Sequence, residues 1–590
     1  MSSHSNIPDR WLTDWDRSSR MPYYTRANAG EVLPDPASPL GWTLVFEKGL
    51  LPGWVRGFVE FGIYRDGELP AYHPPVVGLF GGYFYINLSH CRVMAIRMGM
   101  TVEAFDASLL GNAAGAPPYR PHPEDPCEEC SAKAGATIGE ILAASDFPQI
   151  DADLARVLDK RRKRPDLTTL SDAELVAHAR SFLPELDNAF ARHDYSSLGS
   201  AVGPAMLAEI CAAVGRPELL LDLISGLGEV QSASPSWGLW SLSRLAATSA
   251  ELTSLFDRGV PAVAAALSGA QSGALSGTGD GDVAALRRAL DDFLRDYGQR
   301  GPNEWDIRAI SWEAGPEQVL ALVDSMRHSP DENSPDTRHA RLEQQRHAVA
   351  AGIRGTLADD PTRLQTFDVA LKSAAQTIPL REQTKLIAVT AINEVRMAMR
   401  ELGRRGVDAG RYKAPEDVMM LLESELDEFV ADPDRFSPLI ADRLVQYQAL
   451  FELEPPFIID ANPPPLPRWH RRSRPRRHIA ETREVLRGIG GSAGQYQGTA
   501  RVVTDLPAAL ALEPGEVLVA PLTDAAWTPL FLVAGAVVVD VGALNSHAVV
   551  VSRELGIPCV LSLEDATVRL CTGMELAVDG TAGTVEVVSA

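Results

Sequence analysis

The chain has 590 residues, of which 45% are hydrophobic and 23% are charged, and its formal net charge is −23. A chain of this length is too long to fold around a single hydrophobic core. Its length and composition predict a soluble protein of about three to five structural units. The acidic balance argues against nucleic acid or an anionic membrane as a partner. The longest apolar run, 529–544, contains Asp540 and is too short to span a bilayer. Six cysteines are too few for a disulfide framework and the N-terminus has no signal-peptide core, so the expected compartment is the cytoplasm.

The N-terminal region is predicted to begin with a polar leader, residues 1–20, followed by a loop-like segment in which several prolines favour extended backbone. The alternating aromatic residues of Gly81–Ser89 predict a strand, and their simplest role is core packing. The stretch Gly111–Gly135 is rich in Pro, Ala and Gly and is predicted to be a surface loop. It contains Cys127 and Cys130, a lone CxxC pair for which a surface loop is favoured over zinc or redox chemistry.

The middle of the chain is predicted to be mostly helical. From Ser171 to about Ile459 the apolar periodicity is that of amphipathic helices, with Ala173–Leu183 and Asp282–Tyr297 as clear examples. A Gly- and Ser-rich stretch, 265–281, is predicted to be a flexible link. The basic run 160–164 that precedes this region is interpreted as a solvated helix end rather than a phosphate-binding or targeting segment.

A charged turn interrupts the helices between residues 297 and 308. It contains Arg300, Glu304 and Asp306, which could contact a substrate or a phosphate group. A salt-bridged turn between two helices explains the same residues equally well.

Arg381 and Lys385 are four residues apart, so they project from one face of a helix. We predict that this helix begins near Arg381 and continues to Gly403. Two cations at a helix N-terminus oppose the macrodipole unless an anion binds there, so the pair predicts a phosphate site. The Arg would supply a bidentate fork and the Lys a point charge. Neutralisation of the cations by Glu382 is the alternative.

A Pro- and Arg-rich segment, 460–487, is predicted to be a semi-rigid hinge. It would separate a mostly helical body, 21–459, from an α/β domain, 488–590. Such an arrangement suits a domain that travels between two sites.

The C-terminal domain is organised around His547. The apolar run Ala536–Val541 predicts a buried strand, and a turn at 542–543 follows it. Ser546 is a favourable N-cap, and Gly556 stands where a helix of this length ends. His547 therefore falls in the first helical turn, where backbone N–H groups lack helical partners and the dipole disfavours a charged imidazolium.

A neutral ring at this position could take a phosphoryl group, which the N–H groups would then bind. Ser546 and Arg553 are predicted to support that phosphate. A capped helix whose His547 only faces solvent fits the same local pattern.

These motifs together resemble the PEP-utilising, dikinase-type phosphotransferases. In that family the His of a Gly-Gly-x-x-Ser/Thr-His pattern is phosphorylated, which implies phosphorylation of His547, although Ala543 replaces the second Gly. The turn at 297–308 is similar to the family pattern His-Gly-x-Arg-Gly-x-x-Glu-x-Asp, with Tyr297 in place of the His. Residues 381–385 match the family segment Arg-Glu-x-x-Lys.

The resemblance implies a largely helical substrate-binding body, with some β structure near the N-terminus, and a C-terminal α/β phosphohistidine swivelling domain. It further implies the substrate-and-carrier subunit of a split ATP-dependent phosphotransferase. A partner ATP-grasp subunit would bind ATP and Mg²⁺ and phosphorylate His547. Arg381 and Lys385 would then assist transfer to an acceptor hydroxyl.

The acceptor expected from this resemblance is a phenol, because the division of labour looks most like that of phenylphosphate and alkylphenol-phosphorylating synthases. A rifamycin-type O-phosphotransferase and a non-catalytic scaffold that regulates an ATP-grasp partner are the alternatives. No metal site is predicted on this chain.

Overall fold

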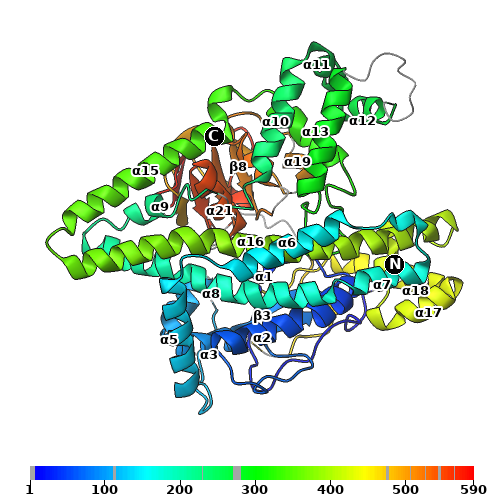
Figure 1. The fold of residues 1–590 in the computed structure, drawn as a ribbon, viewed down its shortest axis with the longest axis horizontal. Coiled ribbons are helices and arrows are strands. Elements are labelled where there is room, and N and C mark those ends of the chain that lie inside the picture. The colour runs from blue at the N-terminus through cyan, green and yellow to red at the C-terminus, as the bar shows by residue number, and fades with distance from the viewer. Residues whose placement is uncertain are drawn as a thin grey trace. The chain divides into compact units, whose positions relative to one another are not determined.

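The chain folds into two compact units. The computed structural model describes residues 7–110, 115–228, 230–269, 281–460, 462–472, 478–504, 506–509, 511–524, 527–542, 546–563 and 565–589. The first unit combines Met1–Val202, Asn303–Ala309 and Gln383–Arg474, and the second combines Gly203–Pro302, Ile310–Glu382 and Pro475–Ala590. Two long helices, α8 (Leu183–Ala213) and α16 (Pro361–Asp408), contribute residues to both units (Figure 1).

The first unit contains a small antiparallel sheet with the strand order β2-β3-β1-β4. Its strands are β1 (Tyr24–Thr25), β2 (Val77–Phe80), β3 (Tyr83–Asn87) and β4 (Ile458–Ile459). Strand β3 confirms the strand predicted within residues 81–89. Its Tyr83 and Tyr85 side chains are buried, in agreement with the core-packing interpretation.

Part of the predicted polar leader belongs to the core of the first unit. Trp11 and Trp15 are only 1% and 4% exposed. The Trp15 backbone N–H donates to Leu79 O at 2.8 Å, and its indole N–H donates to Glu47 at 2.9 Å. Residues 11–15 are therefore not a separate leader, because two indoles there find apolar neighbours that a composition argument does not reveal.

The other helices of the first unit precede the chain's midpoint or follow α16. They are α1 (Ala29–Val32), α2 (Leu51–Phe61), α3 (Leu88–Arg97), α4 (Val102–Leu110), α5 (Glu128–Ala143), α6 (Pro148–Arg162), α7 (Asp172–Arg180), α17 (Leu426–Ala431) and α18 (Pro433–Leu450). Helix α7 begins at a capping box made by Ser171 and Glu174, so its start agrees with the predicted start of the helical region.

The second unit begins with a run of helices. They are α9 (Leu219–Leu223), α10 (Pro235–Thr248), α11 (Ala250–Phe256), α12 (Val260–Gly269), α13 (Asp282–Tyr297), α14 (Glu317–Met326) and α15 (Pro335–Thr356). Helix α13 has the predicted bounds. Most of the predicted flexible link, residues 270–280, lies outside the described residues.

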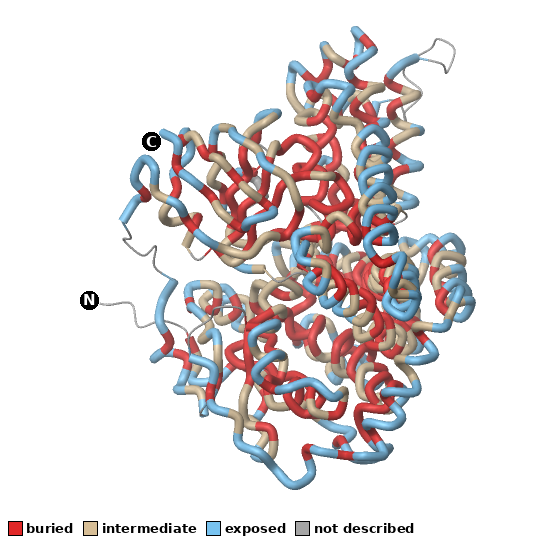
Figure 2. The backbone as a smooth tube through the Cα atoms, turned by 90° about the vertical axis from the view of Figure 1, so that its left-hand side faces the viewer, coloured by how far each residue is buried: buried red, intermediate tan, exposed pale blue. Residues whose placement is uncertain are grey.

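The described part of the second unit also contains an eight-stranded sheet with the order β5-β12-β11-β7-β8-β9-β10-β6. Strands β7 to β10 are parallel neighbours, and the other pairs are antiparallel. The sequences of β8 and β9, VLVA and AVVV, are buried throughout, as parallel strands covered on both faces require. Figure 2 shows where buried residues, in red, and exposed residues, in pale blue, lie along the backbone. The elements are β5 (Val485–Arg487), β6 (Ile489–Ser492), β7 (Gln495–Val502), α19 (Leu506–Ala509), β8 (Val517–Ala520), α20 (Thr528–Phe531), β9 (Ala536–Val539), α21 (His547–Leu555), β10 (Cys559–Leu561), α22 (Ala566–Arg569), β11 (Glu575–Asp579) and β12 (Thr584–Ser589).

The predicted fold class is confirmed: a largely helical chain has strands near its N-terminus and a C-terminal α/β region. The boundaries of the compact units differ from the predicted domains 21–459 and 488–590. Helices between residues 203 and 382 join the C-terminal sheet, because Leu239, Phe293 and Val323 share one apolar core with Leu518 and Phe531. Of the predicted hinge, residues 461 and 473–477 lie outside the described residues.

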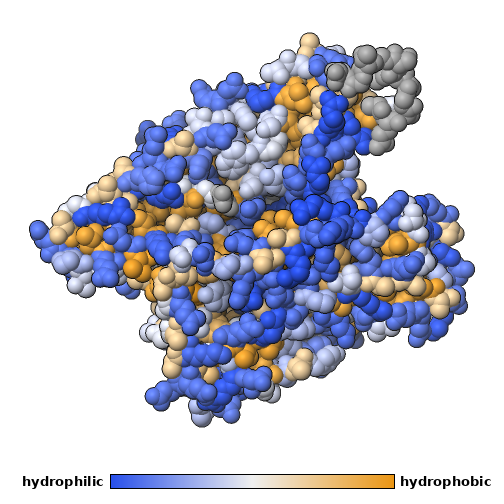
Figure 3. Space-filling model, viewed as in Figure 1, coloured by the Kyte–Doolittle hydropathy of each residue, from blue (hydrophilic) through white to orange (hydrophobic). Residues whose placement is uncertain are grey.

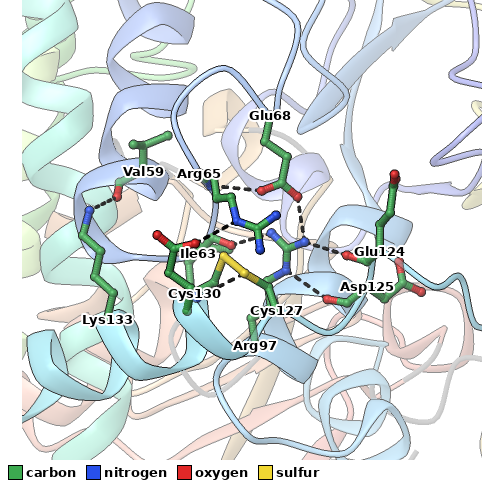
Figure 4. Close-up of a disulfide and its surroundings, with 11 residues drawn as sticks. Val59, Ile63, Arg65, Glu68, Arg97, Glu124, Asp125, Cys127, Cys130 and Lys133 are labelled. Atoms are coloured by element: carbon green, nitrogen blue, oxygen red, sulfur yellow. Dashed lines mark hydrogen bonds and ion pairs between the residues drawn. A yellow bond between two sulfur atoms is a disulfide. The ribbon is translucent and has the colours of Figure 1, made fainter.

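Cys127 and Cys130 form a disulfide at the start of α5, so the surface-loop interpretation of this pair is wrong (Figure 4). Both cysteines are buried, and Cys127 is the N-cap residue of the helix. The buried Arg97 nearby donates to backbone oxygens of Ile63 and Asp125 at 2.8 and 2.9 Å. The disulfide therefore lies at the buried N-terminus of α5, and the predicted surface loop ends before this helix.

The basic run 160–164 is only partly the solvated helix end that was predicted. Arg162 and Lys163 are exposed, but Arg161 is buried and lies 3.1 Å from the Glu394 carboxylate. Arg164 also pairs with Glu394, at 3.3 Å. A buried carboxylate needs such partners, so two residues of the run have a structural role.

Hydrophilic residues cover most of the face seen in Figure 3, and apolar residues form small patches between them. Among the helices of the described chain, none combines the length and the apolar composition that a bilayer span requires.

Candidate active site

His547 is the first residue of α21, which follows β9 in the sheet of the second unit. Ser546 is the N-cap residue with φ −69° and ψ 161°, but its side chain does not cap the helix. The Ser546 hydroxyl is buried and makes no hydrogen bond with a described residue. Gly556 ends the helix at φ 63°, as predicted for a left-handed C′ residue. The predicted turn falls partly on residues 543–545, which lie outside the described residues.

Two threonine hydroxyls hold the His547 imidazole, one at each ring nitrogen. Thr523 Oγ1 lies 3.2 Å from Nδ1, and Thr528 Oγ1 lies 2.9 Å from Nε2. The Phe531 ring packs edge-on against the imidazole at 6.0 Å between centroids. The ring is thus fixed in one orientation, and either nitrogen can form a new bond only after its threonine contact is exchanged.

A hydrogen-bonded path leads from His547 to Arg381 within the second unit. The Thr528 hydroxyl lies 3.5 Å from Ser232 O, and the Ser232 hydroxyl donates to the Glu382 carboxylate. The other oxygen of Glu382 accepts from Arg381 at 3.0 Å. Thr528, Ser232 and Glu382 are buried, at 0%, 1% and 4% exposure. The structure therefore links His547 and Arg381, both predicted site residues of this unit, through Thr528, Ser232 and Glu382.

Sequence reasoning gave no role to Thr523, Thr528 or Ser232. Thr523 precedes the short apolar helix α20 and Thr528 is its first residue, and this pattern was the signal available for them. Ser232 carries no local signal, because it lies 296 residues from Thr528 in the chain. Glu382 does pair with Arg381, which is the alternative that the sequence left open.

Arg381 and Lys385 do not stand at a helix N-terminus, so that prediction is wrong. Helix α16 runs unbroken from Pro361 to Asp408 and contains Pro379 within it. A proline inside a helix removes one N–H and usually marks a break, but here the helix continues on both sides. The macrodipole argument for an anion at this position therefore does not apply, and the two cations remain four residues apart on one helix.

Lys385, Glu304 and Asp306 belong to the first unit. Lys385 Nζ lies 3.1 Å from a Glu304 carboxylate oxygen. Asp306 accepts from Ser38 N at 2.7 Å and from Ser38 Oγ at 2.5 Å. The Arg396 guanidinium donates to the backbone oxygen of Glu304 at 2.7 Å. These contacts match the salt-bridged turn that was the structural alternative, and they bring Lys385 and Glu304 together.

Arg300 lies in the second unit and is 2% exposed. Its backbone N–H donates to Tyr297 O at 3.0 Å, and its own carbonyl accepts from Trp312 N at 2.8 Å. These bonds fix the turn that follows α13. They place the guanidinium inside the packed structure.

Arg553 was predicted to support the phosphate, and the structure contradicts this role. The residue lies in the last turn of α21, about 9 Å along the axis from His547. Its Nε donates to Gly491 O at 2.8 Å, and the side chain is buried. Burial lowers the pKa of Arg553 to about 10. The guanidinium therefore anchors the end of the helix to β6.

Two segments of the chain match known families. Residues 193–382 match the rifampicin phosphotransferase fourth domain, and residues 512–583 match the mobile domain of PEP-utilising enzymes. The first match ends at Glu382, where the second compact unit also gives way to the first. The second match includes strands β8 to β11, His547 and both threonines that contact it.

Curated relatives match about half of the chain. An uncharacterized protein of Mycobacterium tuberculosis is 33% identical over 296 residues, which are 49% of this chain and 30% of that protein. The prodigiosin synthesizing transferase PigC of Serratia marcescens is 31% identical over 305 residues, 50% of this chain and 32% of that protein. A rifampicin phosphotransferase of Streptomyces sviceus is 28% identical over 311 residues, 51% of this chain and 34% of that protein.

The chain thus spans about a third of the length of these relatives. The two family models place a rifampicin phosphotransferase fourth domain and a mobile domain on one chain. The two family matches and these relatives together support a phosphotransferase family of the PEP-utilising type.

Proposed function

We propose that this chain is the substrate-and-carrier part of an ATP-dependent phosphotransferase in which His547 carries the phosphoryl group. The observation that carries this proposal is the environment of His547. Its ring is oriented by two threonine hydroxyls at the start of a helix, beside a buried Ser546 hydroxyl that has no described partner. Free N–H groups and hydroxyls at a helix start are the donors that a phosphoryl group needs.

The proposed reaction has two stages. In the first, ATP and water give AMP, inorganic phosphate and a phosphoryl group bonded to a ring nitrogen of His547. In the second, the acceptor oxygen bonds to phosphorus while the N–P bond breaks, the acceptor hydroxyl loses its proton, and neutral His547 is regenerated. Arg381 would stabilise the charge on the phosphoryl oxygens during transfer, and Lys385 would add a second cation.

The phosphoryl donor is proposed to be ATP with Mg²⁺ on a partner ATP-grasp subunit. This chain would then load His547 only when that partner is present. Calorimetry of the chain alone should detect no micromolar binding of ATP, whereas the complex should bind it. Micromolar ATP binding by the isolated chain would contradict the division into subunits.

The acceptor is proposed to be a small hydroxylated molecule, with a phenol as the first candidate. The match to the rifampicin phosphotransferase fourth domain favours a second candidate, a natural-product hydroxyl. A panel of phenols, rifamycins and polyols, assayed with the loaded carrier, distinguishes these classes. A complex that loads His547 but uses no acceptor would favour the scaffold alternative.

The test of the carrier role is chemical. ATP radiolabelled in its β-phosphate should leave label on the protein, and that label should be acid-labile and base-stable, because protonation of a phosphoramidate makes the imidazole a good leaving group. His547→Ala should remove the label and turnover while it changes the unfolding free energy by about 1 kcal/mol or less. Label that survives acid, or that persists in the Ala variant, would place the phosphate elsewhere, for example on Ser546.

A further inference from the structure

Glu554 lies on the same helix as His547 and makes a separate contact with the helical part of the second unit. Its two carboxylate oxygens accept from the backbone N–H groups of Leu227 and Gly228 at 3.1 and 3.3 Å. Glu554 is 3% exposed, so this carboxylate is buried against the loop that it binds. His547 and Glu554 are about two helical turns apart and therefore project from the same side of α21.

In the loop between α9 and α10, Ile224–Ser234, the described residues before position 229 are arranged to receive this carboxylate. Gly226 and Gly228 have φ values of 59° and 74°, a left-handed backbone that lets neighbouring N–H groups converge on one anion. A Cβ on Gly226 would lie 2.6 Å from Leu342 Cβ of α15, so this glycine is also required by packing. Helix α15 packs on both α9 and α21 (Figure 1).

The same loop contacts the other end of the carrier site. Ser232 O lies 3.5 Å from the Thr528 hydroxyl, which in turn contacts the His547 ring. Ser232 also donates to Glu382, the partner of Arg381. One loop therefore contacts the end of α21 directly, through Glu554, and reaches its start indirectly, through Thr528 of α20.

We propose that Glu554 is a positioning residue: its carboxylate docks helix α21 on the loop Ile224–Ser234, so that phosphorylated His547 is presented to the acceptor side. This inference rests on the proposed function. A carrier must leave this position to be reloaded, and that movement would break the Glu554 contact together with the packing of α15 on α21.

Hydrogen exchange of the full chain at pH 8, followed by mass spectrometry of peptides from residues 224–234, tests the docking. Glu554→Ala removes the acceptor for both N–H groups, and exchange of Leu227 and Gly228 should rise on the order of tenfold or more. Glu554→Gln keeps one oxygen acceptor and should give a smaller rise. Glu586→Ala removes an exposed Glu of the same α/β region and should leave the loop unchanged.

The functional arm uses potassium phosphoramidate, a small phosphoryl donor, to load His547 without the partner subunit. Loading should be equal in the wild type and Glu554→Ala, whereas single-turnover transfer from His547 to a phenol or rifamycin acceptor should slow about tenfold. A role confined to fold stability would affect both stages. A wild type that cannot be loaded contradicts the proposed function, while the exchange experiment still reports on docking.

Unchanged loop exchange in Glu554→Ala would overturn the proposal. So would equal slowing of loading and transfer. If Glu554→Ala raises exchange throughout the chain, the variant is globally destabilised, and Glu554→Gln then decides: a rise confined to the loop supports docking, and no local rise overturns it.

Discussion

Thr528 Oγ1 lies 2.9 Å from Nε2 of His547, and the same hydroxyl lies 3.5 Å from Ser232 O. A hydroxyl has one proton, so when Thr528 donates to the Ser232 carbonyl it can only accept a hydrogen bond from Nε2–H. That arrangement leaves Nδ1 unprotonated and facing the Thr523 hydroxyl at 3.2 Å. When Thr528 instead donates to the ring, Nε2 is the unprotonated nitrogen. The two threonines therefore couple the tautomer of His547 to the loop that carries Ser232.

Thr528→Val should slow loading of His547 by about fivefold to tenfold, because loss of one neutral hydrogen bond is worth about 1 kcal/mol and the ring becomes less well oriented. Phosphoramidate loading followed by a test of acid lability measures the effect. Thr499→Val changes an exposed threonine of β7 and serves as the matched control. Equal loading rates in both variants would show that Thr528 does not orient the ring.

Arg381→Ala should slow transfer to the acceptor by about a hundredfold to a thousandfold, as expected for a lost charged contact in the transition state. Loading of His547 by the partner subunit should change little. Lys372→Ala removes an exposed cation from the same helix and is the control. Because Arg381→Ala also leaves Glu382 without this cation, the double variant with Glu382→Gln should be measured alongside it. A fall in both stages, or in neither, would contradict the assigned role.

Lys385→Ala should also slow transfer and spare loading. Its ion pair with Glu304 in the first unit means that some loss of stability is expected as well. Thermal unfolding separates the two effects, because Glu304→Gln should reproduce the loss of stability but not the loss of transfer rate. If both variants slow transfer equally, the role of Lys385 is to hold the turn.

Protein stability should depend on pH through Glu554. Burial raises the pKa of Glu554 from 4.5 to about 7, against the opposing effects of the two backbone N–H groups, Arg346 and Arg553. The folded state therefore binds a proton more tightly than the unfolded state, and the resulting stability is lost as the pH rises from about 4.5 to about 7. The size of the effect is on the order of 3 kcal/mol.

Glu554→Gln cannot titrate, so its unfolding free energy relative to the wild type should increase between pH 5 and pH 8. Denaturant unfolding at both pH values measures this difference, in which the contributions of other groups cancel. A difference that stays constant would mean that Glu554 has no raised pKa.

Gly556→Ala should destabilise the second unit by about 1–2 kcal/mol, because an L-residue is strained at φ 63°. The new methyl group would also lie 3.2 Å from an Arg341 guanidinium nitrogen. Gly352 lies at an exposed position of α15 with no atom near the added methyl. Gly352→Ala should therefore stabilise the protein, by about 0.5–1 kcal/mol. Thermal unfolding measures both variants, and melting temperatures that shift in the same direction would contradict the opposite signs expected here.

Local sequence determined the elements whose signals lie within a few residues. The Val-rich β9, the N-cap position of Ser546 and the left-handed Gly556 define the start and end of α21, and they placed His547 at its first position. Helix α13 likewise has the bounds that its apolar periodicity predicted. These features depend on backbone propensity and on the pattern of one strand or helix, so they need no knowledge of what packs against them.

Only the tertiary structure decided which elements share a core and which residues complete the site. The sequence predicted a helix that begins near Arg381, but α16 starts at Pro361 and is continuous across Pro379. Ser232 reaches Thr528, and Gly228 reaches Glu554, across 296 and 326 residues of chain. Such pairs are set by burial of apolar surface and by the need of buried polar groups for partners. Neither apolar burial nor the pairing of buried polar groups can be predicted from neighbouring residues in the sequence, because each depends on residues that only the folded chain brings together.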